Sequence, residues 1–149
     1  INLVDLRLQR QCPLYSNIIE KWQNSRKSDW ESVDIEPNSK VTENEFNSLF
    51  QQKNLSYLEA NGDTVKLNLT DSTWKDNFRN GTYSFLSLRK TNKNEFIIRF
   101  ISSNHETRSK FSKVGDEYRY RVIEKSSDYY LLTVQPVGVN RIMKFKLYY

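Results

Sequence analysis

From Val65 to the end of the chain, apolar and polar residues alternate in one short run after another. In the clearest run, residues 118–122, two arginines separate three apolar residues, and residues 143–149 repeat the pattern with lysines. A two-residue period with one apolar face is typical of β-strands that place one side on a core. Short turns between such runs make neighbouring strands antiparallel. The sequence therefore predicts a curved antiparallel sheet or barrel.

Two helices are expected before this sheet. Pro13 suits the first turn of one helix, and apolar residues follow it at helical spacing. Thr42 and Glu45 form the capping box of the second, which is expected to end near Lys53. The apolar stripes that we expect to pack on the sheet are Phe46, Leu49 and Phe50, together with Leu14, Ile18 and Trp22. The predicted fold class is α+β, a single domain over 1–149 with a helical part over about 1–53 and an antiparallel β-meander over about 55–149.

Three segments are less regular. The polar stretch 27–40 predicts a loop or an extended segment, and Trp74 and Phe78 fall in a polar insert that reads as a helical turn or a loop over one end of the sheet. Residues 108–113 are predicted as a weak strand. Asn61-Gly62 is typical of a hairpin turn, and it precedes the first clear strand.

Composition limits the kinds of site that the chain can build. Its 149 residues, with a net charge of +5, suffice for one domain. Cys12 and His105 are the single cysteine and the single histidine, so neither an internal disulfide nor a multi-ligand zinc site is expected. No apolar run approaches the roughly 20 residues of a membrane span. We expect no cofactor, no metal and no membrane span.

The sequence favours a binding protein over an enzyme. Nucleophile-elbow, zinc-protease and phosphate-loop motifs are absent, and there are only four glycines. The alternative is a small enzyme in which His105, in a polar loop, acts as a general base with a carboxylate.

Tyrosines are concentrated on the last three predicted strands, where arginines lie between them. A tyrosine has an apolar ring and a polar tip, which suits a ligand pocket. The candidate ligand-binding residues are Trp74, Tyr118, Tyr120 and Tyr130. Arg119 and Arg121 are the candidate partner-binding residues. Two other interpretations stay open: the aromatic residues are simply good strand formers, or they form a basic platform for single-stranded nucleic acid.

Residues 80–85 (Asn-Gly-Thr-Tyr-Ser-Phe), the paired runs 118–123 and 129–134, and a closing run at 141–149 resemble the small lipocalin-like β-meanders. The resemblance covers about half of the chain. It implies a partial barrel that holds a small apolar ligand or serves as a binding scaffold. The cone-shaped α+β fold of nuclear transport factor 2-like proteins is the alternative, because it shares the order of helices followed by a curved sheet.

The expected function is recognition, either of a small apolar ligand in the concavity of the sheet or of a protein partner on its aromatic, basic face. Sequons at Asn54, Asn68 and Asn80 are compatible with secretion, and we expect a secreted or envelope (periplasmic) protein. Since the first residue is Ile1 rather than Met, a processed or trimmed chain is expected.

Overall fold

The computed structural model describes residues 29–149, and nearly all of this part is antiparallel sheet. Its nine strands are β1 (Glu31–Val33), β2 (Leu55–Leu58), β3 (Thr64–Leu69), β4 (Thr73–Asn77), β5 (Tyr83–Asn92), β6 (Glu95–Ser103), β7 (Glu117–Lys125), β8 (Tyr129–Pro136) and β9 (Ile142–Tyr148). The helices of this part are α3 (Glu43–Leu49) and α4 (Glu106–Phe111). None of its helices has the length and apolarity needed to cross a membrane.

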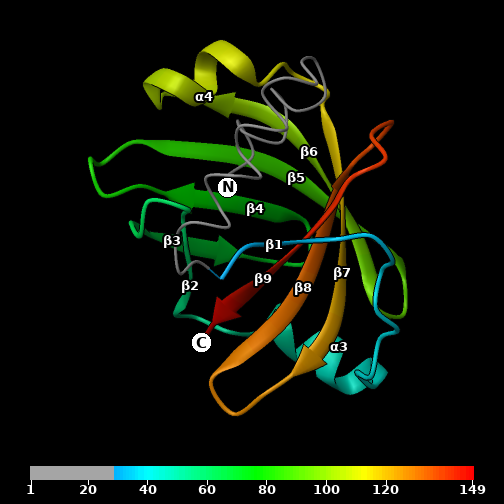
Figure 1. Cartoon of the computed structure of the whole chain (residues 1–149). Helices are drawn as coiled ribbons and strands as arrows, with labels where there is room; N and C mark the ends of the chain where they lie inside the picture. The colour runs from blue at the N-terminus through cyan, green and yellow to red at the C-terminus, as the bar shows by residue number, and fades with distance from the viewer. Residues whose placement is uncertain (1–28) are drawn as a thin grey trace.

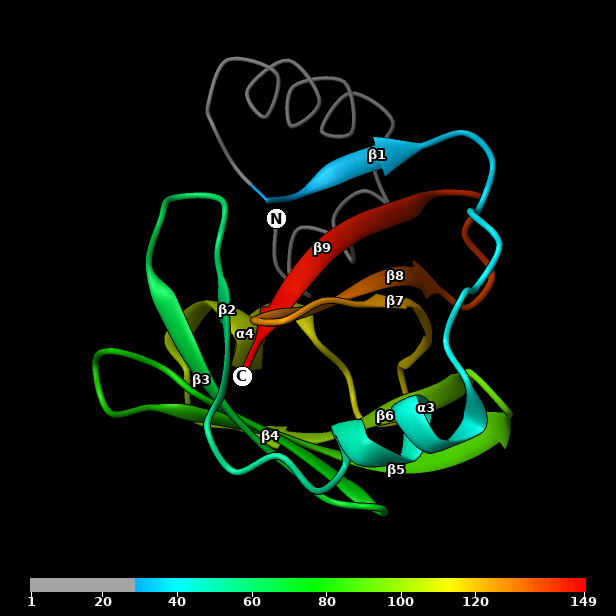
Figure 2. The same cartoon turned by 90° about the horizontal axis from the view of Figure 1, so that it is seen from below.

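The sheet closes on itself. Strands β2 to β8 pair in chain order, β9 pairs with β8 along most of its length, and Tyr148 of β9 meets Ser56 of β2. The result is an eight-stranded barrel, with β1 as an additional strand that pairs with the first residues of β9. Figure 1 shows α3 and α4 at opposite ends of this barrel, and Figure 2 shows the strands surrounding a common interior.

The interior of the barrel is filled by side chains, as expected for a barrel of eight strands. The ring of Tyr120 stacks on Phe96 with centroids 5.3 Å apart and lies 4.9 Å from the ring of Trp74. Near β9, Trp30 stacks on Phe145 at 4.3 Å. All these rings are buried, so the middle of the barrel is a packed core.

Helix α3 closes one end of the barrel, and its capping box is confirmed. The Oγ1 of Thr42 accepts a hydrogen bond from the backbone N–H of Glu45 at 3.2 Å, and the Glu45 carboxylate accepts one from the N–H of Thr42 at 2.8 Å. The expected packing of Phe46, Leu49 and Phe50 on the core is also confirmed, whereas Leu14, Ile18 and Trp22 lie outside the described residues. The helix ends at Leu49 rather than near Lys53, because the following N–H groups bond to carbonyls three residues back and turn the chain into β2.

Replacing Thr42 with alanine should destabilise the protein by about 1 kcal/mol, the usual loss for an N-cap side chain. The substitution removes the acceptor for the Glu45 N–H at an exposed position, so no core packing is lost. Urea denaturation measures this difference. Thr42→Ser retains the hydroxyl and should have wild-type stability; equal stabilities of the Ala and wild-type proteins would show that the cap does not fix α3.

The predicted α+β fold class is wrong. Of the described residues, about 51% are strand and 10% are helical, and the first predicted helix lies outside them. The predicted antiparallel sheet is confirmed, and its closure is consistent with a lipocalin-like barrel. The barrel is closed rather than partial, and the cone-shaped alternative is wrong, because β9 joins β8 to β2. Period-two patterning indicates strands but does not indicate which strands pair at the two edges of the sheet.

Two segments differ from their predicted structure for local reasons. The insert with Trp74 is not a helical turn or a loop but strand β4, in which Trp74 and Asp76 point inward. The inward carboxylate of Asp76 interrupts the apolar alternation, so the sequence pattern does not indicate a strand here. The segment 108–113 is not a strand, because His105 caps a helix there and Arg108 is buried.

The polar stretch 27–40, predicted as a loop or an extended segment, contains β1 and then runs along the outside of the barrel. We call residues 34–41 the strap. The backbone N–H of Lys40 donates to the carbonyl of Ile123 at 2.7 Å, and the hydroxyl of Ser39 donates to the carbonyl of Val122, also at 2.7 Å. These bonds fix the strap to β7.

Candidate functional site

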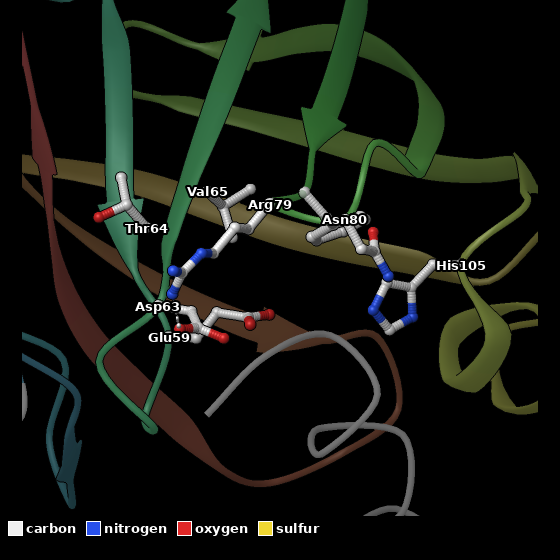
Figure 3. Close-up of a pocket in the computed structure, with 8 residues that line it drawn as sticks. Glu59, Asp63, Thr64, Val65, Arg79, Asn80 and His105 are labelled. Carbon is white, nitrogen blue, oxygen red and sulfur yellow. Dashed lines mark ion pairs between the residues drawn. The ribbon is translucent and has the colours of Figure 1, made fainter.

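A pocket opens at the end of the barrel opposite α3, and we call it the mouth pocket (Figure 3). Its volume is about 400 Å³. Its walls come from the β2–β3 turn, the β4–β5 turn and the residue before α4. The lining residues are Glu59, Asp63, Thr64, Val65, Phe78, Arg79, Asn80 and His105.

Two tight turns set the rim of the mouth pocket. In the first, Asn61 accepts the N–H of Asp63 at 2.9 Å, and Gly62 has a φ of +90°, which favours glycine. In the second, Asn80 accepts the N–H of Thr82 at 3.1 Å. The hairpin predicted from Asn61-Gly62 is therefore confirmed, and it places the Asp63 carboxylate at the rim.

Beneath the pocket lies a buried arginine from α4. The Arg108 side chain is 1% exposed, its Nη1 lies 3.3 Å from Asp76 Oδ2, and its Nη2 bonds to Glu59 Oε1. The guanidinium lies 4.1 Å from the centroid of the Phe78 ring, a cation–π contact. Arg108 thus joins α4 to residues of β4 and of the β2–β3 turn.

Asp76 is held by further donors. Its Oδ1 accepts hydrogen bonds from Trp74 Nε1 at 2.9 Å and from the Tyr57 hydroxyl at 3.0 Å. Burial raises the pKa of Asp76, although Arg108 beside it acts in the opposite direction. Burial also raises the pKa of Tyr57 well above its ordinary value, so its hydroxyl remains a donor. We call Arg108, Asp76, Glu59, Tyr57 and Trp74 the Arg108 network.

Burial alone would lower the pKa of Arg108, but Tyr57, Asp76 and Glu59 hold it above its usual range. The arginine is therefore a permanent buried cation between two carboxylates. Such a group is tolerated only where its partners have good geometry and their remaining lone pairs are bonded.

His105 forms the wall opposite the carboxylates of Glu59 and Asp63 (Figure 3). Its Nδ1 accepts the backbone N–H of Arg108 at 3.4 Å and so caps α4. Burial lowers the pKa of His105, and the charge of Arg108 acts in the same direction. The neutral ring therefore carries its proton on Nε2, which is a hydrogen-bond donor.

The stability of the protein should fall as the pH drops below about 6.5, the ordinary pKa of histidine. Because the folded-state pKa of His105 is lowered, the unfolded chain binds the proton first, and the loss levels off below the folded-state pKa. Asparagine also caps helices but does not titrate in this range. We therefore expect the melting temperature of His105→Asn to fall less than that of the wild type between about pH 7.5 and about pH 5.5. If the melting temperatures of the two proteins fell equally, protonation of His105 would not be the cause of the loss.

The charges of the lining residues do not cancel. Two carboxylates, Glu59 and Asp63, face one guanidinium, Arg79, which gives a formal charge of −1 with His105 neutral. Asp63 Oδ1 and Arg79 Nη1 are 3.8 Å apart, and their side chains are 47% and 85% exposed. Acceptors therefore lie on one side of the mouth pocket and a histidine donor on the other. Within residues 29–149, no group of three or more His, Cys, Asp or Glu side chains could hold a metal ion.

The four residues predicted to bind ligand lie elsewhere. Trp74 belongs to the Arg108 network, Tyr118 and Tyr120 are buried inside the barrel, and Tyr130 is buried near α3 with its hydroxyl 2.7 Å from Ser48 Oγ. None of them lines the mouth pocket. Their role in ligand binding stays a prediction.

The structure brings Arg119 and Arg121 together on the outside of β7. Glu36 of the strap lies 3.0 Å from Arg119 Nη2 and 3.5 Å from Arg121 Nη1. Arg119 also bonds to Glu95 at 3.1 Å and to Gln135 at 2.8 Å. Carboxylates of the same chain therefore offset much of their charge, and a role in partner binding stays a prediction.

Sequence reasoning missed Glu59, Asp63, Asp76 and Arg108. One signal for Asp76 was present: Trp74, Asp76 and Phe78 continue a two-residue period, so the carboxylate occupies an inward position. An inward carboxylate requires a buried partner, but the partner is Arg108, 32 residues further along the chain. No spacing rule connects the two.

The chain has no significant match among protein-family models, curated proteins or solved structures. We therefore infer the function of this protein from the geometry of the barrel and of the mouth pocket.

Proposed function

We propose that this protein is a non-enzymatic binding protein that holds a small molecule in the mouth pocket of a lipocalin-like barrel. The observation that carries the proposal is the pocket itself. Its volume of about 400 Å³ falls within the range of small-molecule sites, and it combines an apolar Phe78 with a few convergent polar groups.

The polar groups around the pocket are held in place before any ligand arrives. Glu59 is bonded to Arg108, Asp63 accepts the side-chain amide of Asn61 at 3.2 Å, and His105 is fixed by the N–H of Arg108. Such preorganisation lowers the entropy cost of binding. Polar groups that are held in place in this way are expected in a ligand site rather than in an incidental hollow of the surface.

The architecture supports the lipocalin-like part of the proposal. Eight antiparallel strands close around a core, one end is covered by α3, and the pocket lies at the other end. The ligand that we propose differs from the apolar molecule expected in the concavity. Trp74, Phe96 and Tyr120 fill the middle of the barrel, which favours a ligand at the polar mouth. Secretion remains part of the proposal, since Asn54 and Asn68, the asparagines of two of the three sequons, are exposed outside the mouth pocket, whereas Asn80 lines it.

A fragment screen on the full-length protein, followed by two-dimensional amide NMR, tests this function. We expect the shift changes produced by the hits to cluster at the β2–β3 and β4–β5 turns and at His105. Hits that shift only the amides around Arg119 and Arg121 would instead favour recognition of a partner on the outer face. A screen without any hit at the mouth pocket would contradict the proposal.

A further inference from the structure

We infer that the ligand of the mouth pocket is a small organic cation, a compact molecule that carries an ammonium or amidinium group together with a hydrogen-bond acceptor. This inference rests on the proposed function and names the ligand class for the same site. Three observations carry it: the local charge, the loose pairing of Asp63 and the His105 donor on the opposite side.

The pocket is locally acidic in a basic protein. The carboxylates of Glu59, Asp63 and Asp76 outnumber the guanidiniums of Arg79 and Arg108 by one, whereas the whole chain carries a net charge of +5. At physiological ionic strength, charges more than about 8 Å away are largely screened, so the ligand responds to the local charge. An organic cation is therefore attracted here, and an anion is not.

Asp63 is the carboxylate that a ligand can reach. Its side chain is half exposed, and its ion pair with the highly exposed Arg79 is long, at 3.8 Å. Exposed pairs of this kind contribute little to stability. Arg79 therefore occupies the carboxylate only loosely, and a cationic ligand can take its place. Glu59, by contrast, is already bonded to Arg108.

The second half of the ligand is indicated by a donor. His105 lines the wall opposite Glu59 and Asp63 (Figure 3), and its Nδ1 is used in capping α4. The proton of the neutral ring is therefore on Nε2, which is a hydrogen-bond donor. An acceptor atom on the ligand fits this side, while its cationic group fits Asp63.

Three probes with the same ring separate charge from shape: meta-hydroxybenzylamine, meta-hydroxybenzyl alcohol and meta-hydroxybenzoate. We expect the amine to shift the mouth-pocket amides of the full-length protein with a dissociation constant of about 1 mM, as is usual for so small a molecule. The alcohol and the benzoate should bind at least about tenfold more weakly, because they lack the charge-assisted bond.

Two substitutions should act in opposite directions on the amine. Asp63→Asn should weaken its binding by about five- to tenfold, because a charge-assisted bond becomes a neutral one. Arg79→Gln should strengthen binding about two- to fivefold, because the competing cation is removed. Asp128→Asn, an exposed change in the β7–β8 turn, is the matched control and should leave binding unchanged.

Equal or tighter binding of the alcohol or the benzoate at the mouth pocket would overturn the cationic ligand and leave the proposed function intact. The same holds if Asp63→Asn and Asp128→Asn bind the amine equally. If none of the three probes binds, the cation inference is wrong. The fragment screen then decides independently whether the mouth pocket binds another class of molecule.

Discussion

Arg108→Met should lower the free energy of unfolding by about 3–5 kcal/mol, the loss expected when one partner of a buried ion pair is removed. The substitution leaves Asp76, which is fully buried, without its cation, and it also removes the bond to Glu59. Methionine retains much of the apolar volume of the side chain, so the lower free energy of unfolding reflects mainly the missing charge of the guanidinium. Urea denaturation of both proteins measures it.

The matched control is Arg79→Met, which removes an exposed arginine from a loose ion pair at the same end of the barrel. We expect this variant to lose less than about 1 kcal/mol. The triple variant Arg108→Met, Asp76→Asn, Glu59→Gln should recover part of the loss, because no unpaired charge then remains buried. Similar losses for Arg108→Met and Arg79→Met would show that the Arg108 network does not stabilise the fold.

Tyr120→Ala should also cost about 3–5 kcal/mol, as do other aromatic deletions in packed cores. The ring of Tyr120 is buried among Phe96 at 5.3 Å, Trp74 at 4.9 Å and Phe145 at 6.0 Å, so its removal leaves a cavity in the middle of the barrel. Tyr120→Phe retains the ring and should retain most of the stability. Thermal and urea unfolding both report the change.

Tyr129 provides the comparison for this prediction. It lies on β8 with its ring toward the outside, in contact with Tyr148 at 6.2 Å. Tyr129→Ala should therefore cost about 1 kcal/mol, the typical value for a partly exposed site. If Tyr120→Ala were as stable as Tyr129→Ala but lost ligand binding, Tyr120 would line a pocket, as the sequence alone suggested.

The strands and α3 could be predicted because their signals are local. Alternation along β7 and the Thr42–Glu45 capping box each lie within a few residues. Closure of the barrel could not be predicted, because the contact of β9 with β2 joins Tyr148 to Ser56, which lies far away in the sequence. Nothing in either strand marks the other as its neighbour.

The mouth pocket was hidden by one missed strand. In an antiparallel meander, alternate connections lie at the same end of the barrel, so the turns after β2, β4 and β6 share one end. Without β4, the connections after β5 and β6 are assigned to the wrong ends, and the Asn61-Gly62 turn is separated from His105. Asp76 hid β4 because its inward carboxylate is satisfied by Arg108, a partner that no sequence period indicates.

The most direct test of a ligand site at the mouth compares two tryptophan variants at exposed positions. Thr64 is exposed and lines the mouth pocket, whereas Lys93 is exposed in the β5–β6 turn and does not line it. Thr64→Trp should obstruct the pocket and abolish binding of the molecules that the NMR screen identifies, and Lys93→Trp should bind them as the wild type does. Equal binding by the two variants, measured by calorimetry, would contradict the account.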